Sequence, residues 1–470
     1  MTNANVSDST RAGAGAPPAP AGSMRATPPP PIGRTAPYVA EWERSEPERG
    51  RRQPAWLRQR RRAALDRFVD LGFPGTRLED WRFTNVAPIA EAHFALAGPA
   101  SLSAADLAPW TVDHAGAQLV FVNGRFAPDL SVVGALPPGV VVGPLSAVVE
   151  AAEGPAGTPF GRLAPDAAFP ALNTAFFADG AAIIVPPHVV IETPIHVLFV
   201  SAPGGPATMA FPRVLIVAGE DSQARVVESH AGTPGAAYFT NAVTEVALGE
   251  HAMVEHVRIQ RESGSAFHVG LVQVEGQRDS VYTAHAFALG GALVRNDVAA
   301  VMAGEGMECT LNGLYVATDR QLVDNHTLID HAKPHGTSHE LYKGVLGGRA
   351  RGVFNGKIVV RPDAQKTDAK QTNRALLLSD DAMIDTKPQL EIFANDVKCT
   401  HGAAVGQLDE DAVFYLRSRG LGADEARAML IHAFAGDVLD RVRIEPVRDR
   451  LRGVLIARID AELQARGDRS

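Results

Sequence analysis

The residues best suited to chemistry in this chain lie close together near its C-terminal end. Cys399 is one of only two cysteines, and His401 follows it two positions later. In an extended strand, an offset of two places both side chains on one face. A neighbouring imidazolium favours the thiolate, which is the nucleophilic and metal-ligating form of cysteine, and Lys398 adds positive charge. Taken alone, these residues favour a buried apolar cysteine beside a hydrogen-bonded histidine over a reactive pair.

A second group of candidate metal ligands lies upstream. Four histidines occur within a short segment, at His326, His331, His335 and His339. Their spacings of five, four and four residues fit no single zinc signature. In a strand, odd and even offsets place side chains on opposite faces. The segment therefore indicates either a polar ladder along a β-structure or a standalone metal-binding protein.

Other enzyme motifs are absent from the sequence or weak in it. No phosphate-binding GxxxxGK[ST], GxGxxG between a strand and a helix, or GxSxG nucleophile motif is found. ATP hydrolysis by this chain itself is therefore not expected. The acidic pairs Asp380/Asp381 and Asp363/Asp368 leave open a β-helical carbohydrate-active enzyme that works with paired carboxylates.

Composition narrows the class of protein. A net charge of −8 and a pI near 6 argue against a nucleic-acid partner. Two cysteines, Cys309 and Cys399, exclude a disulfide framework and suit a reducing compartment. No apolar run is long enough for a membrane span, and residues 1–37 lack the apolar core of a signal peptide. We therefore expect a cytoplasmic protein whose Ala/Pro-rich residues 1–37 form a disordered tail.

Residues 38–178 are predicted to form a mixed, largely helical region. An arginine-rich, helix-prone run covers Tyr38–Asp70, and the polar-aromatic run Leu78–Val86 ends it. Asn123-Gly124 lies between two apolar runs, which is the strongest short signal for a hairpin. Helical spacing returns at Phe169–Phe177.

Residues 179–408 are predicted to form a β core. Apolar runs of about five to nine residues alternate with Gly, Asp, Asn or Pro, as expected for strands and turns. Roughly fifteen such runs are many for one barrel or sandwich. Similar turns recur at Gly219–Ala224 and Gly249–Ala252, about thirty residues apart. Sandwich, barrel and solenoid all remain open on this pattern, which favours the solenoid.

Residues 409–470 return to helical spacing. Asp409 and the two acidic residues after it suit a helix N-terminus, and Gly420 suits a helix end. The next helix is predicted to bury one apolar stripe, formed by Ala426, Met429, Leu430, Ala433 and Phe434. We expect these helices to close the open last coil of the solenoid or to serve as a docking element for a partner.

Several long motifs resemble the SufB/SufD family of iron–sulfur cluster assembly proteins, and its SufD type in particular. They read FNGKIVV, AQKTDAKQTNRALLLS, TKPQLEIFANDVKCTHGAAVGQLDED and FYLRSRG, preceded by VDNHTLIDHAKPHGTSHELYKGVL and, near the start, LEDWRFTNV. The resemblance is strong from about Gly313 to Ala435. SufB-type chains carry a cysteine near the place of Asn373, which this chain lacks. The resemblance implies a right-handed parallel β-helix between helical terminal regions.

The resemblance also implies a role. The chain would be a non-catalytic scaffold subunit of a SufBCD-type complex, paired with a SufB-like paralogue and driven by a SufC-like ABC ATPase, or a homodimer when alone. It would hold no permanent cofactor, and His401 and Cys399 would contact a transient iron–sulfur cluster at the paralogue interface. The residues expected to dock the ATPase are Asp409, Phe414, Tyr415, Arg419, Met429 and Phe434. Flavin binding, the cluster type and the route of sulfur remain open.

Overall fold

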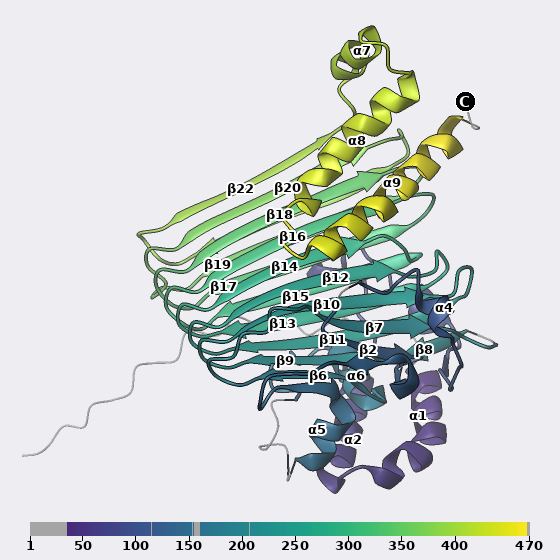
Figure 1. The fold of residues 1–470 in the computed structure, drawn as a ribbon, viewed down its shortest axis with the longest axis vertical. Coiled ribbons are helices and arrows are strands. Elements are labelled where there is room, and N and C mark those ends of the chain that lie inside the picture. Colours follow the sequence, from purple (N-terminus) through teal and green to yellow (C-terminus); the bar gives the residue numbers. More distant parts are fainter. Residues whose placement is uncertain (1–34, 114, 153, 155–159, 206, 468–470) are drawn as a thin grey trace, which may run out of the picture. The chain divides into compact units, whose positions relative to one another are not determined.

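Two facing β-sheets dominate the computed structural model, which describes residues 35–113, 115–152, 154, 160–205 and 207–467. From Gly180 to Gly406, most successive strands alternate between the sheets, so that each coil contributes one strand to each (Figure 1). Val226 pairs with His256, which pairs with Ala284, at spacings of 30 and 28 residues. The core is therefore a β-solenoid, as predicted.

Most strands of the solenoid are parallel and about ten residues long. The first sheet contains β5 (Val141–Pro144), β6 (Gly180–Val185), β9 (Arg213–Ala218), β11 (Tyr238–Leu248), β13 (Phe267–Gly276), β15 (Leu293–Met302), β17 (Leu322–His331), β19 (Arg351–Val360) and β21 (Met383–Ile392). In addition, β8 (Thr208–Ala210) pairs with β11, and β1 (Ala95–Leu96) pairs with β8. The second contains β3 (Arg125–Phe126), β2 (Ala117–Val122), β7 (Ile195–Ser201), β10 (Gln223–Gly232), β12 (Met253–Arg261), β14 (Val281–Ala288), β16 (Glu308–Ala317), β18 (Thr337–Leu346), β20 (Asp368–Leu377) and β22 (Lys398–Gly406), with β4 (Val132–Val133) beside β2.

One corner of the solenoid is built from stacked left-handed turn residues. Asp221, His251 and Asp279 occupy equivalent places in three successive coils, each with φ between 52° and 58°. The backbone N–H of Asp221 donates to Glu250 O at 2.9 Å, and that of His251 donates to Arg278 O at 2.9 Å. This ladder of turns explains the recurrence seen in the sequence. Gly306 and then His335 have the same left-handed backbone at this corner in the next two coils.

Most of the N-terminal helices lie on the first sheet, whereas the short helix at Ala104–Leu107 packs through Leu107 on the second sheet. The N-terminal helices are α1 (Ala36–Arg49), α2 (Ala55–Leu71), α3 (Ala87–Glu91), α4 (Ala104–Leu107), α5 (Leu145–Ala151) and α6 (Ala168–Phe176), with 3-10 turns at Gly50–Arg52, Glu79–Trp81 and Pro128–Leu130. The predicted run Tyr38–Asp70 is thus two helices, because Pro54 and the preceding turn separate them. A buried ion pair between Arg213 and Glu245 (2.6 Å) supports α6, since Arg213 also donates to Asn173.

The predicted hairpin is confirmed. Phe121 of β2 pairs with Phe126 of β3, and Asn123 and Gly124 between them both have positive φ. Because β2 then pairs with β7, this hairpin extends the second sheet at the start of the solenoid.

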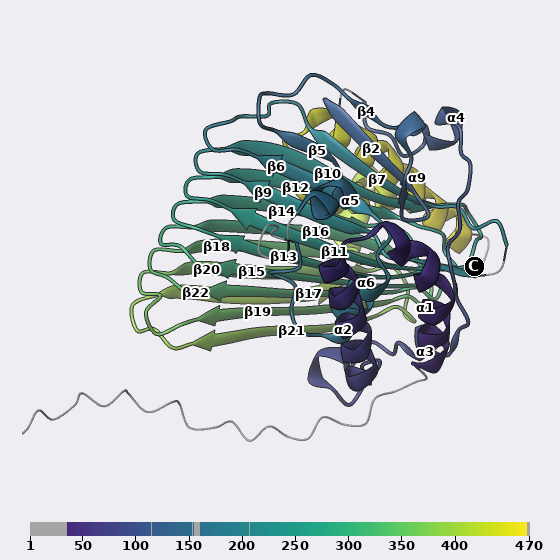
Figure 2. The same cartoon turned by 90° about the horizontal axis from the view of Figure 1, so that it is seen from below.

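The C-terminal helices are α7 (Glu410–Ser418), α8 (Ala423–Leu439) and α9 (Glu445–Gly467). The prediction that they close the last coil is wrong. Instead, α8 and α9 lie along the outer face of the second sheet (Figures 1 and 2), and Arg450 of α9 donates to Ala108 O at the end of α4. Outward apolar side chains of β10 to β20, such as Val257 and Val345, pack against them. The last coil therefore remains uncovered by any described helix.

The predicted apolar stripe of α8 is also partly wrong. Ala426 is buried, but Met429 and Ala433 are exposed. The buried face further along is formed by Ile431, Ala435, Val438 and Leu439. Helix α8 therefore has two apolar rows, one with Met429 and Ala433 and one with Ile431 and Ala435. Contact with the sheet covers the second row. Among the described residues, no helix combines the length and the apolar character that crossing a membrane requires.

Candidate functional site

Cys399 and His401 lie on β22, the last strand of the second sheet. Cys399 pairs in register with Ala369, and His401 with Gln371. Both β20 residues are buried, and Gln371 reaches across the lumen to the backbone of Gly356 in the opposite sheet. The two candidate residues therefore continue the lumen-facing rows of the solenoid to its open end. Cys399 is half-buried and His401 is exposed.

The open end presents two unpaired strand edges. In the described chain, β22 pairs only with β20, and β21 only with β19. Met383 and Phe393 donate their backbone N–H groups back to the first sheet, so alternate residues such as Pro388 face outward. A proline is tolerated there because it removes no ladder bond. The β22 edge contains no proline and offers an uninterrupted row of backbone donors and acceptors.

The surroundings of Cys399 in the structure disfavour the thiolate form of its side chain. Partial burial and the nearby carboxylate of Asp368 raise the pKa of Cys399, and a hydrogen bond from the Ala369 backbone only partly opposes this. The side chain lies against the apolar cluster that includes Ile358 and Val360. Burial and Asp368 therefore disfavour the thiolate, which agrees with a buried apolar cysteine rather than with stabilisation of the thiolate by His401 and Lys398.

A buried carboxyl group lies two strands below His401 in the same row. Glu340 of β18 pairs in register with Gln371, which pairs with His401. Gln371 Nε2 donates to Glu340 Oε2 at 2.7 Å. Burial raises the pKa of Glu340 to about 7, and hydrogen bonding to Thr327 and Gln371 lowers it only in part. A group that exchanges a proton near neutral pH thus lies beneath the open end.

This carboxyl group predicts a pH-dependent stability. Its folded pKa lies above its ordinary value of 4.5, so the folded state loses stability as pH rises from about 4.5 through 7. At 1.36 kcal/mol per pKa unit, a shift from 4.5 to about 7 makes the loss at pH 8 at most about 3 to 4 kcal/mol. Glu340→Gln keeps an acceptor for Gln371 and should raise the urea midpoint at pH 8 but not at pH 4.5. The exposed Glu308→Gln is the control, and an equal effect of Glu340→Gln at both pH values would contradict the assignment.

The four upstream histidines do not converge. His331 is buried and its Nε2 lies 2.9 Å from Ser338 Oγ, whereas His335 is an exposed turn residue and His339 is exposed on β18. Among the described residues, no group of three or more His, Cys, Asp or Glu side chains is placed to hold a metal ion. The four histidines are instead spread over β17, the turn at His335 and β18.

His326 and Asp324 help to fasten the N-terminal region. His326 Nε2 lies 3.1 Å from Asp324 Oδ1, and Arg295 Nη1 donates to Asp324 Oδ2 at 2.7 Å. Thr84 donates to the same carboxylate, and the Arg295 guanidinium lies 4.2 Å from the centre of the Trp81 ring. The LEDWRFTNV motif thus supplies Trp81 and Thr84 to a polar anchor on the first sheet.

Three of the four residues in the acidic pairs occupy turns, and Asp368 is the first residue of β20. Asp380 and Asp381 precede β21, and Asp363 precedes β20. Asp368 forms an ion pair with Lys370 at 3.2 Å.

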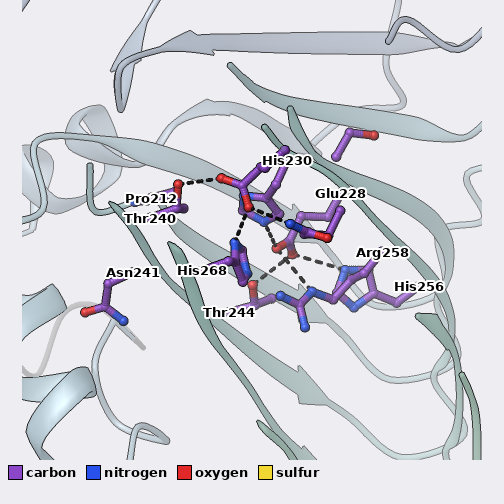
Figure 3. A network of polar contacts seen from close by, with 12 residues as sticks. Pro212, Glu228, His230, Thr240, Asn241, Thr244, His256, Arg258 and His268 are labelled. Atoms are coloured by element: carbon purple, nitrogen blue, oxygen red, sulfur yellow. Dashed lines mark hydrogen bonds and ion pairs between the residues drawn. The ribbon is translucent and has the colours of Figure 1, made fainter. Parts of the chain in front are cut away.

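The sequence analysis missed a polar network buried in the lumen (Figure 3). Glu228 lies at its centre. Glu228 Oε1 lies 2.7 Å from His230 Nε2, and its Oε2 lies 3.2 Å from His256 Nε2 and accepts from Thr244 at 2.8 Å. His256 Nδ1 continues the network to Tyr282 OH at 3.0 Å. A second carboxylate, Glu262, lies next to it and takes part through His268 at 2.7 Å.

Burial and neighbouring residues determine which side chains of this network are charged. Burial opposes ionisation of Glu228, but Arg258 and the hydrogen bonds from His230 and His256 hold the pKa of Glu228 well below its usual range. Burial lowers the pKa of His230 despite the carboxylate. Glu228 is therefore the anion and Arg258 its cationic partner. The signal was partly available, because Glu228/His230 and His256/Arg258 are polar pairs at alternate positions of two strands that also carry several valines.

The residues expected to dock a partner separate into two sets. Phe414 (71% exposed) and Tyr415 (57%) lie on α7, and Met429 (49%) lies on α8. Asp409 caps α7, accepting from Asp411 N at 2.9 Å, and the Arg419 guanidinium lies over the Tyr415 ring. Phe434 is different, because its ring lies 4.7 Å from Lys343 Nζ and it packs on the solenoid.

Comparisons with known proteins agree with the fold. Residues 199–434 match the family model described as the SUF system FeS cluster assembly SufBD core domain, and residues 35–197 match the SufBD protein N-terminal region. A SufBD family iron–sulfur cluster assembly protein of Synechocystis is 35% identical over 84% of this chain and 90% of the relative. The SufD protein of Escherichia coli is 30% identical over 85% and 91%, and that of Bacillus subtilis is 28% identical over 86% and 94%.

Proposed function

Because this chain belongs to the SufBD family of iron–sulfur cluster assembly proteins and is a homologue of SufD, we propose that it is the SufD-like scaffold subunit of a SufBCD-type complex. Its partners would be a SufB-like paralogue and a SufC-like ABC ATPase, which would supply ATP hydrolysis. The observation that carries this proposal is the uncovered end of the solenoid, where an unpaired strand edge bears Cys399 and His401. Family membership favours this role over a carbohydrate-active enzyme or a standalone metal-binding protein.

The paralogue would pair with the open edge. Unpaired backbone groups of an edge strand are a ready template for a strand of another chain. The exposed apolar residues Met383, Phe393 and Val405 flank these strands and would be buried by the partner. Because a second copy of this chain offers the same edge, a homodimer is the alternative state of the isolated protein.

Iron and sulfide would be the cargo of this interface. His401 would offer a neutral imidazole, which is an acceptable ligand for iron. Cys399 would first have to lose its proton, and a bound metal ion supplies the positive charge that drives this loss. We therefore assign His401 the larger role on this chain and Cys399 the smaller one.

The ATPase would act through the C-terminal helices. Phe414, Tyr415 and Met429 offer apolar surface outside the helix–sheet contact, and closure of two ATPase subunits would pull on it. Lys343 of β18 joins this region to the solenoid, since its Nζ lies 2.7 Å from Asp437 Oδ2 and donates to Phe434 O at 3.0 Å. Motion of α8 would thus reach the strands that end at the cluster-building edge.

The pairing can be tested with one backbone change. Lys398 donates its N–H to β20, so by alternation Ala403 directs its N–H to the open edge. Ala403→Pro should weaken recovery of the paralogue with the tagged chain more than tenfold while leaving the solenoid folded, because no internal ladder bond is lost. Ala404→Pro, which removes an internal bond, is the comparison. Undiminished pairing by a folded Ala403→Pro chain would place the interface elsewhere.

A further inference from the structure

A large cleft lies away from the open edge of the solenoid and from α7. It runs between α9 and the turns that follow β10, β12 and β16, and has a volume of about 900 Å³. Trp110 forms one wall, and Val454 and Ala457 of α9 form another. Gly235 and Gly264 line the turns, and a side chain added at either would meet no neighbouring atom within 4 Å. The cleft is therefore roomy and has both aromatic and aliphatic walls.

Two arginines in this cleft are bonded only to backbone carbonyls. Arg261 Nη1 donates to Pro109 O at 2.9 Å, and Arg450 Nη2 donates to Ala108 O. Across the described residues, neither side chain forms an ion pair with a carboxylate, and the buried Nε of Arg450 has no hydrogen-bond partner. Burial and the positive charge of Arg450 lower the pKa of Arg261. Two like charges are thus held together without a counter-ion.

The acidic residues of the cleft are engaged elsewhere. Glu262 turns into the lumen, where it accepts from Thr240 at 2.6 Å and from Gln260 at 3.0 Å. Asp319 and Glu462 act on Arg458, whose pKa is lowered by burial and raised by these two carboxylates. They therefore balance the third arginine of the cleft and leave the charge of Arg261 and Arg450 available.

We propose that this cleft binds a small phosphate-bearing molecule. Its phosphoryl oxygens would accept from Arg261 and Arg450, since guanidinium groups match phosphate oxygens in charge and geometry. A planar or apolar remainder would lie between Trp110 and the small residues of α9. None of these residues belongs to the cluster-building edge or to α7, so the inference stands apart from the proposed function.

Calorimetric titration of the full chain with pyrophosphate and with adenosine 5′-diphosphate tests the site. Both should bind, and Arg261→Gln/Arg450→Gln should weaken both at least tenfold. Trp110→Leu should weaken only the ligand that carries a ring system. The control is Arg452→Gln, an exposed residue of the same helix that pairs with Asp440. Absence of pyrophosphate binding at millimolar concentration, or equal loss in the control, would overturn the proposal.

Hydrogen exchange on the unsubstituted chain provides a second readout that needs no variant. Pyrophosphate should slow exchange in peptides that cover Pro109–Trp110 and Arg450–Arg458, because a bound anion would tie the loop to α9. Binding with protection confined to other segments would also overturn the assignment.

Discussion

His401→Ala is expected to reduce cluster formation by the reconstituted complex at least tenfold while the complex assembles normally. The imidazole is exposed at the open end of the lumen, so its removal leaves no buried group unsatisfied and should not unfold the chain. Only a ligand is lost. Cluster yield is followed by absorbance and by bound iron and sulfide, and assembly by co-purification of the paralogue and ATPase.

Two variants sharpen this experiment. His339→Ala removes an equally exposed histidine from β18 and should leave the yield unchanged. Cys399→Ser should have a smaller effect than His401→Ala, because the raised pKa of the thiol makes it the poorer ligand. A full yield of cluster from the assembled His401→Ala complex would remove His401 from the mechanism, and a dominant effect of Cys399→Ser would reverse the assigned roles.

Phe414→Glu should abolish recovery of the ATPase, with affinity reduced by a factor of about 100 or more. The ring is 71% exposed on α7, so a carboxylate there costs the folded chain little but would be desolvated in an apolar interface. Ile456→Glu on α9, also an exposed apolar position, is the matched control. Binding is measured by pull-down and folding by circular dichroism.

Phe434→Glu separates docking from folding. This ring packs on the solenoid and lies over Lys343, so the substitution should lower the melting temperature of the chain itself. Phe414 and Phe434 are both among the residues expected to dock the ATPase, but only Phe414 is an exposed large apolar residue in the structure. Retention of the ATPase by the Phe414→Glu chain would show that α7 is not the docking element.

The sequence allowed the solenoid to be predicted because its signals are local. Short apolar runs, recurring turns and the Asn123-Gly124 hairpin depend on neighbouring residues, and all appear in the structure. An offset of two also places Cys399 and His401 on one face. Local spacing does not say which face becomes the lumen, however. Glu228 and Glu340 were therefore missed, although alternation of polar and apolar residues marks their strands.

Long-range packing accounts for the two errors in the helical region. Two apolar rows on α8 compete for burial, and only contact with the sheet covers Ile431 and Ala435 while exposing Met429. The same contact carries α8 and α9 along the side of the solenoid. Spacing alone also cannot say how deeply Cys399 is buried, since its burial by Ile358 and Val360 depends on residues about forty positions away.

The Lys343–Asp437 ion pair fastens α8 to the solenoid at β18 and not at the open edge. Along the second sheet, β18 is followed by β20 and then by β22. This ion pair therefore attaches α8 two strands before the open edge. Force applied at α7 would enter at β18 and be shared through two intact hydrogen-bonded ladders. The terminal strand β22 would then move together with β20 and β18 and would keep its hydrogen bonds to them. The open edge would therefore return to the same pairing register after each movement.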